Sequence, residues 1–378
     1  MRSGRSVSAP SLRFTALDSL RGIAALGVAL HHIVAVNGPA SWSLFGNGGL
    51  FVDFFFVLSG FVIAASYGER LAQGFSLARY AMLRIGRVWP LHAVMVLVAL
   101  GLEVAAWLFG SQGLSAYAPF TGTHSPGHAL TSFLLLDGYF PGRTNFYSGA
   151  GWSISVELLL YALAALAFRG GRWGMAALMG AGALGLALHL AMLDLPGLTT
   201  MVQRGLAGFA LGTACWFIHL RLAAFRLGGA SLIEGLAIAA LFLAIALADS
   251  TADAALVIVP AALVVLVFAR EQGALSQVLQ AAPFEWLGRI SYSIYMVHAM
   301  VQARIMDLLL LASRGAERPM AEYALSGAVP VKRMLLDPLE ATLVQAAMIA
   351  AVLLVAHFAW RWIEEPARQW SRRYSTRF

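Results

Sequence analysis

A chain of 378 residues that is 60% hydrophobic and only 12% charged does not fit a soluble globular protein, because its polar residues are too few to cover so many apolar side chains. The net charge of +7 fits membrane topology and contact with anionic lipids, and gives nucleic-acid binding little support. An integral membrane protein is therefore expected.

The apolar residues fall into ten blocks, each long enough to cross about 30 Å of hydrocarbon as a helix. They are continuous runs without the period-two alternation of a membrane β-barrel. The sequence therefore predicts an all-α integral membrane protein, a bundle of about ten transmembrane helices. The expected spans are residues 16–37, 48–66, 88–110, 152–168, 173–193, 200–218, 231–248, 252–269, 288–312 and 341–362.

The basic residues indicate the orientation, because Lys and Arg are retained in short cytoplasmic segments. With both termini in the cytoplasm, one membrane domain (16–366) lies between a cytoplasmic N-terminal segment (1–15) and a basic cytoplasmic tail (367–378). The cytoplasmic arginines are then Arg2, Arg5, Arg13, Arg70, Arg79, Arg84, Arg87, Arg169, Arg172, Arg221, Arg226, Arg270, Arg368, Arg372, Arg373 and Arg377, while the outer segments hold Arg143, Arg314, Arg318, Lys332 and Arg333.

The first span carries ionisable side chains, which are costly inside a membrane and usually mark function. Arg21 and His32 are eleven residues apart, so they lie about 20° apart around a helix and about 16 Å apart along it. His31 is rotated by about 100° from His32. Asp18, one turn before Arg21, is expected to pair with it. Arg21 and His32 therefore share a face but lie at different depths.

Two later spans carry carboxylates near their outer ends, Asp53 in the second and Glu157 in the fourth. At 1.5 Å per residue, His32, Asp53 and Glu157 all lie about 8 Å below the outer boundary. This coincidence groups the three as one candidate site, and the alternative is that each is an isolated packing solution. The single cysteine, Cys215, excludes an intrachain disulfide and any cysteine-based metal cage. No metal is expected at this site.

The ninth span carries Ser291, Tyr295 and His298 at intervals of four and three, which forms one polar stripe on a helix. Two interpretations are open: hydrogen bonding between helices, or the lining of a tunnel. Elsewhere, Pro90 is expected at the start of the third helix and Pro366 is expected to end the last one. The apolar patch 129–140 in the first long outer loop predicts a re-entrant or surface helix.

Six motifs in the chain resemble those of the membrane-bound acyltransferase 3 family, in family order. They are "LDSLRGIAALGVALHH", "GLFVDFFFVLSGF", "RIGRVWP", "WSISVE", "SYSIYMVH" and "WRWIEEPAR". The resemblance implies an O-acyltransferase of the bacterial inner membrane. Such enzymes move an acyl group, often acetyl, from cytoplasmic acyl-coenzyme A to a hydroxyl of a glycan, a glycolipid or a small acceptor, as in polysaccharide O-acetylation.

The resemblance also implies residue roles. Arg21, Arg84 and Arg87 match the family's arginines, and guanidinium groups suit the phosphates of coenzyme A. His32 matches the family's histidine and is expected to be the general base. Glu157 or Asp53 would orient its imidazole, and which one does so stays open. The donor-binding set is completed by Ser59, Tyr295 and His298.

Three alternatives are weighed against direct acetyl transfer. Ser59 in "VLSGF" would be the nucleophile of an acyl-enzyme route, although it is expected nearer the cytoplasm than His32. The donor could instead carry succinyl or a longer acyl chain. A secondary transporter would also use buried charges, and only the ordered motifs favour the enzyme over it.

Overall fold

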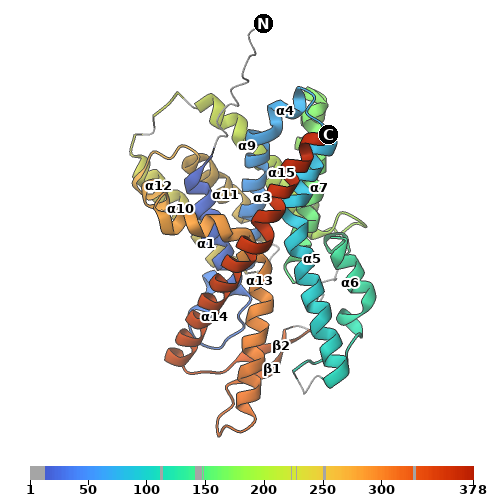
Figure 1. Cartoon of the computed structure of the whole chain (residues 1–378). Coiled ribbons are helices and arrows are strands. Elements are labelled where there is room, and N and C mark those ends of the chain that lie inside the picture. The colour runs from blue at the N-terminus through green and yellow to red at the C-terminus, as the bar shows by residue number, and fades with distance from the viewer. Residues whose placement is uncertain are drawn as a thin grey trace.

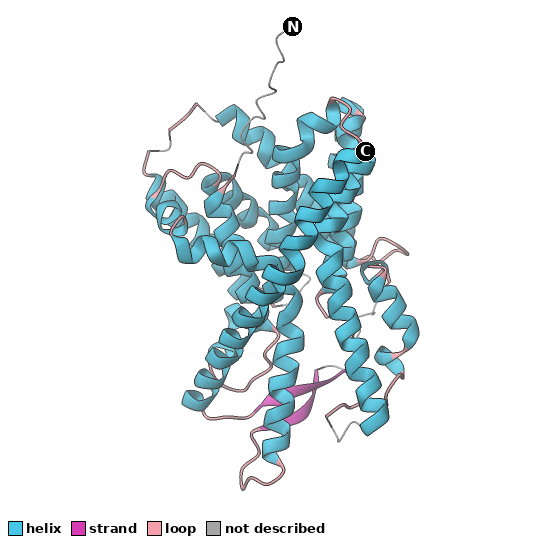
Figure 2. Ribbon diagram, viewed as in Figure 1, coloured by secondary structure: helices cyan, strands magenta, loops and turns pink. Residues whose placement is uncertain are grey.

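The computed structural model describes residues 13–110, 114–140, 147, 149–222, 224–226, 228–249, 253–326 and 329–378. The predictions for Arg2, Arg5 and Arg143 lie outside this part of the chain. The structure is 78% helical with almost no sheet, as Figure 2 shows. This helical content confirms the predicted all-α class. Continuous apolar runs form helices because a helix satisfies all of its own backbone hydrogen bonds.

Figure 1 shows the helices and strands coloured in chain order. They are α1 (Thr15–His31), α2 (Ser43–Gly46), α3 (Phe51–Ile63), α4 (Glu69–Ala72), α5 (Leu77–Phe109), α6 (Pro126–Phe133), α7 (Gly151–Arg169), α8 (Gly171–Leu190), α9 (Thr200–Leu222), α10 (Ala230–Ala246), α11 (Ala254–Phe268), α12 (Ala274–Leu279), α13 (Ala282–Ser313), α14 (Pro338–Ala359) and α15 (Glu365–Tyr374); the two strands are β1 (Ala321–Ser326) and β2 (Val329–Met334).

A helix occurs at each of the ten predicted positions, but the count of ten membrane spans is not confirmed. Seven helices in the described chain are long and apolar enough to cross a membrane. The remaining three are shorter: α1 and α10 have 17 residues each and α11 has 15. Several apolar helices of spanning length make this a multi-pass membrane protein.

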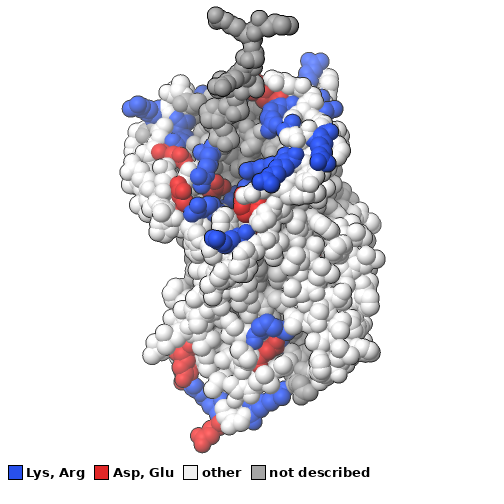
Figure 3. All heavy atoms as spheres, viewed as in Figure 1, with Lys and Arg blue, Asp and Glu red and all other residues white. Residues whose placement is uncertain are grey.

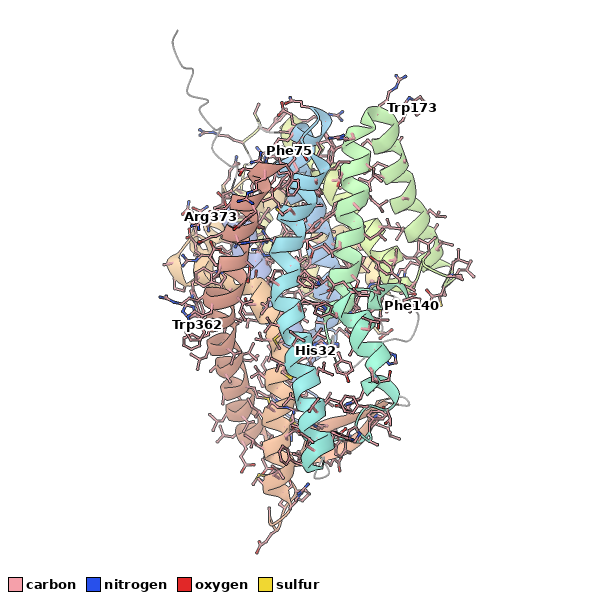
Figure 4. All side chains as sticks on the ribbon, turned by 45° about the vertical axis from the view of Figure 1, so that its right-hand side comes forward. His32, Phe75, Phe140, Trp173, Trp362 and Arg373 are labelled. Carbon is pink, nitrogen blue, oxygen red and sulfur yellow. The ribbon has the colours of Figure 1, made fainter. Side chains whose placement is uncertain are left out.

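On the face shown in Figure 3, charged side chains gather at the two ends and leave an almost uncharged band between them. We call the end that holds α4, α15 and the start of α1 the basic end, and the end that holds β1 and β2 the hairpin end (Figure 1). Arg373 and Phe75 lie toward the basic end in Figure 4. Since hydrocarbon disfavours charge, the uncharged band is the part that faces the lipid tails.

Helices α1 and α13 pack closely side by side, and glycines make this approach possible. A Cβ on Gly22 would lie 2.7 Å from the backbone of Leu287, and one on Gly288 would lie 2.6 Å from the carbonyl oxygen of Asp18. Side chains cannot be accommodated at such distances, so both positions require glycine. The close contact places the α1 face that carries Arg21 and His32 directly against α13.

Both proline expectations are wrong. Pro90 lies inside α5, which begins thirteen residues earlier, at Leu77, where the Ser76 side chain accepts from the backbone amide of Arg79. Pro366 does not end the last helix, because a π-helical turn at Trp360–Glu364 joins α14 to α15. Proline is tolerated there in the first turn after an irregularity, where the i→i−4 ladder is already interrupted.

The hairpin end is built from two long loops, α5–α7 and α13–α14, and from the segment that follows α1. Strands β1 and β2 pair antiparallel from Ala321↔Met334 to Ser326↔Val329. The amide of Val36 donates to the carbonyl of Met334, and the amide of Met334 donates to that of Val34. The chain just beyond His32 is thus tied to the hairpin. In the other loop, helix α6 confirms that the apolar patch starting at Ala129 forms a helix in part.

Candidate functional site

A cavity of about 450 Å³ opens at the basic end, and we call it the entrance cavity. Its wall holds five arginines and three carboxylates, so the net charge of the wall is positive. The segment before α1, helices α1, α5, α13 and α15 and the turn between α14 and α15 supply these residues. The charged members are Arg13, Asp18, Arg21, Arg87, Arg289, Glu364, Glu365 and Arg368. A cationic wall of this kind attracts an anionic ligand.

Arg21 is held against α13 in the entrance cavity. Its Nε donates to Ser291 Oγ at 2.8 Å, and one terminal nitrogen donates to the carbonyl of Gly288 at 3.1 Å. The predicted pair with Asp18 is confirmed, with 3.1 Å between nitrogen and oxygen. Arg21 is therefore positioned by both its own helix and α13.

A second cavity, of about 100 Å³, continues from the first into the bundle, and we call it the inner cavity. The two share six lining residues: Arg21, Leu58, Val62, Arg87, Ser291 and Tyr292. Arg87 points into both and has no hydrogen bond or ion pair with any residue that the structure describes. Arg84 lines only the inner cavity and donates to Tyr67 Oη at 2.7 Å. Among the three arginines that line the inner cavity, Arg87 is thus the one left available to a ligand.

Glu157 also lines the inner cavity, but the structure does not bring it to His32. Its Oε1 accepts from Ser59 Oγ at 3.1 Å and from the Tyr161 hydroxyl. The carboxylate, the serine and the tyrosine form one hydrogen-bonded group on the α3–α7 side of the cavity. Ser59 therefore faces a carboxylate acceptor within the inner cavity, as part of its polar wall.

His32 lies within the bundle, away from both ends (Figure 4), and its partner is His298 on α13. His32 Nδ1 is 2.9 Å from the carbonyl of Val28 and 3.3 Å from His298 Nε2. His298 Nδ1 is 2.7 Å from the carbonyl of Tyr295. A carbonyl accepts only, so both Nδ1 atoms carry the proton when the rings are neutral.

This tautomer assignment leaves His32 Nε2 with a free lone pair. Among the described residues nothing donates to it, and His32 is exposed, whereas His298 is fully buried. His298 Nε2 accepts from the His32 N–H and fixes that ring, which is the role that a carboxylate has in a triad. The neighbouring His31 points elsewhere, with Nδ1 at 2.7 Å from the carbonyl of Gly46.

Asp53 belongs to a buried ion pair, and the structure does not bring it to His32. Arg204 Nε and a terminal nitrogen bind its two carboxylate oxygens at 3.0 and 2.6 Å. Asp53 is 0% exposed and Arg204 5%. Both of its oxygens are thus engaged by α9, and neither contacts His32 among the described residues. The expected grouping of His32, Asp53 and Glu157 is therefore not found, since each has different partners.

Sequence reasoning missed Arg204 and the histidine pair. An arginine four residues into a predicted span was itself a signal, because a charge at that depth needs a partner. The contact between His32 and His298 joins residues that are 266 positions apart. The stripe on α13 does face one site: Ser291 binds Arg21, Tyr295 lines the inner cavity and His298 contacts His32.

For the acyl transfer that the sequence motifs predict, removal of the His298 imidazole is expected to lower turnover by about 10- to 100-fold, since a misplaced reacting group costs up to this factor. The His298→Ala variant should keep its donor affinity, because His298 does not line either cavity. The kcat and KM of the His298→Ala variant measure these two effects. His357→Ala, on α14, is the control. An unchanged kcat for His298→Ala in folded protein would show that His32 needs no such partner.

The described residues contain no group of three or more His, Cys, Asp or Glu side chains arranged to hold a metal ion.

The sequence of this chain is similar to a known protein family and to other known proteins. Residues 14–360 match the family described as the acyltransferase domain. The chain is 33% identical over 181 residues to "Protein 2 in picA locus" of Rhizobium radiobacter, covering 45% of this chain and 87% of that protein. It is 27% identical over 329 residues to "Acyltransferase MdmB" of Streptomyces mycarofaciens, covering 77% and 79%. No solved structure gives a significant match.

Proposed function

Because the chain belongs to the acyltransferase 3 family, we propose that it transfers an acyl group, in the first place acetyl, from cytoplasmic acyl-coenzyme A to an acceptor hydroxyl at or across the bacterial inner membrane. The observation that carries the proposal is the arginine-walled entrance cavity, which continues through the inner cavity toward the histidine pair. The basic end is assigned to the cytoplasm, where arginine-rich segments are retained.

The donor's anionic part fits the entrance cavity. Coenzyme A carries phosphates, and guanidinium groups bind phosphate through two parallel charge-assisted hydrogen bonds. Arg21 and Arg87 line both cavities, so they suit a ligand whose charged end stays at the entrance while its thioester arm enters. Ser59, Arg84 and Tyr295 line the inner cavity and would contact that arm.

The chemistry needs a base for the acceptor hydroxyl, and His32 Nε2 has the free lone pair for it. In a direct transfer the hydroxyl proton passes to His32 Nε2 while the oxygen attacks the thioester carbonyl. The carbon–sulfur bond then breaks, and the coenzyme A thiolate takes up the proton from His32. His298, in contact with His32 at 3.3 Å, holds the ring throughout. We therefore replace the two carboxylates with His298 as the orienting group.

Acetyl is proposed over succinyl or a longer chain from the family resemblance, since such enzymes often move acetyl. A glycan acceptor is proposed from the family resemblance, and it would approach His32 from the hairpin end.

The proposed function is tested by release of free coenzyme A from purified protein in nanodiscs. Acetyl-, succinyl- and octanoyl-coenzyme A are each supplied with and without a panel of glycan acceptors. Acetyl-coenzyme A should give the fastest acceptor-dependent release. Equal release with and without every acceptor, or none at all, would contradict acyl transfer, and uptake of a solute by liposomes holding the protein would then favour the transporter alternative.

Arg87→Ala is expected to weaken binding of acetyl-coenzyme A by about 10- to 100-fold, since hydrogen bonds to charged groups contribute about 1.5–3 kcal/mol each. Isothermal titration with the intact donor and with dephosphorylated pantetheine thioester measures this. Only the phosphorylated donor should lose affinity. Arg169→Ala is the control, because that arginine binds the carbonyl of Phe75 and lines neither cavity. Equal affinities of Arg87→Ala and wild type for acetyl-coenzyme A would show that Arg87 does not bind the donor's phosphates.

A further inference from the structure

The wall of the inner cavity includes Tyr295 and Ser153 but neither residue of the histidine pair, His32 and His298. The ring of Tyr295 lies 5.9 Å from that of His298, and the ring of His298 lies 4.7 Å from that of His32. One aromatic side chain thus stands between the cavity and the two histidines.

Tyr295 is fixed in this position by contacts with two other helices. Its hydroxyl is 2.7 Å from Ser153 Oγ and donates to the carbonyl of Ala150 at 3.2 Å. Its ring packs edge-to-face on Phe55 of α3 at 5.8 Å between centroids. Tyr295 is 5% exposed. The contact with Ser153 therefore latches α13 to the start of α7.

We propose that Tyr295 is a gate between the donor cavity and the acceptor side, and that it makes the enzyme select an acceptor hydroxyl over water. The proposal rests on the proposed function, since it concerns the same thioester and the same base. With the latch closed, the thioester in the inner cavity is separated from His32. Rotation of Tyr295 away from Ser153 joins the two spaces and lets transfer proceed.

The chemical need for such a gate follows from the exposure of His32. A base that removes a proton from an acceptor hydroxyl removes one equally from water. The water oxygen would then attack the thioester carbonyl and the carbon–sulfur bond would break. The products would be a free carboxylic acid and coenzyme A, with the proton returned to the thiolate. A closed site prevents this side reaction.

Loosening of the latch is expected to raise hydrolysis without acceptor. Tyr295→Phe keeps the ring and removes both hydroxyl contacts, and Ser153→Ala removes one of them. We expect coenzyme A release in the absence of acceptor to rise about fivefold in Ser153→Ala, since one net hydrogen bond shifts an open–closed equilibrium by roughly this factor, and at least as much in Tyr295→Phe. Tyr139→Phe is the matched control, because its hydroxyl also binds a carbonyl of α7, that of Ser155, outside both cavities.

A second measurement does not depend on turnover. Ser59, in the inner cavity wall, is changed to cysteine in a Cys215→Ala background, and a membrane-impermeant maleimide is added from the hairpin side. Leu325→Cys, at an exposed position of β1, reports complete access from that side. Labelling of Ser59→Cys should be slow with Tyr295 in place and at least about fivefold faster with Tyr295→Phe.

The two measurements separate the gate from the proposed function. Faster labelling in Tyr295→Phe supports the gate even if no acyl-coenzyme A is turned over, which would contradict only the proposed function. Labelling at the wild-type rate overturns the gate, whatever the hydrolysis rate. A loss of acceptor-dependent transfer in Tyr295→Phe, with hydrolysis and labelling unchanged, also overturns it and makes the hydroxyl part of donor binding.

Discussion

His32→Ala is expected to reduce acyl transfer by about 10²- to 10⁴-fold, the range that a general base contributes. The free lone pair on His32 Nε2 follows from the two carbonyls that hold the Nδ1 protons of His32 and His298. Donor binding should be unchanged, because His32 lines neither cavity. Acceptor-dependent release of coenzyme A and titration of acetyl-coenzyme A measure the two quantities separately.

His31→Ala is the matched control for this prediction. It removes the same side chain from the adjacent position, where Nδ1 contacts the carbonyl of Gly46 and not α13. Turnover in His31→Ala should stay within a few-fold of wild type. If the two variants lose turnover equally, the loss reflects the packing of this segment, and the assignment of His32 as the base fails.

Loss of one partner of the Asp53–Arg204 pair is expected to destabilise the fold by about 3–5 kcal/mol, because it leaves an uncompensated buried charge. Both residues are almost fully buried and bound through two contacts. Asp53→Leu and Arg204→Leu should therefore each lower the unfolding midpoint in detergent. The double variant should recover most of the loss, since replacing both charges with apolar groups is often nearly neutral.

The double variant also decides between a structural and a catalytic Asp53. If the pair only joins α3 to α9, refolded Asp53→Leu/Arg204→Leu should transfer acyl groups at close to the wild-type rate. If the double variant is stable but its turnover falls by 100-fold or more, the pair has a role in the reaction beyond joining the two helices.

Relations within one helix followed from the sequence. The helical period places Arg21 and His32 on one face and His31 on another, and the structure shows that face against α13. The pair of Asp18 and Arg21 follows from a spacing of three. The positions of the apolar helices could be predicted for the same reason, since a run of about 20 apolar residues is a property of the local chain.

The contacts between side chains of different helices did not follow from the sequence. Depth alone grouped Asp53 and Glu157 with His32, but depth fixes only one coordinate. The angular position of each residue depends on which helices adjoin, and that depends on close contacts such as those of Gly22 and Gly288. Asp53 faces α9 and binds Arg204, Glu157 faces Ser59, and His32 faces His298.

The sequence by itself thus determined the class of fold, the approximate helix positions, the family and the residues that carry charge into the membrane. Only the tertiary structure decided which of these residues meet. Contacts over 266 residues, as between His32 and His298, or 151, as between Asp53 and Arg204, arise from packing of whole helices. A local period or spacing does not specify these contacts, because the same helix face can pack against many different neighbouring helices.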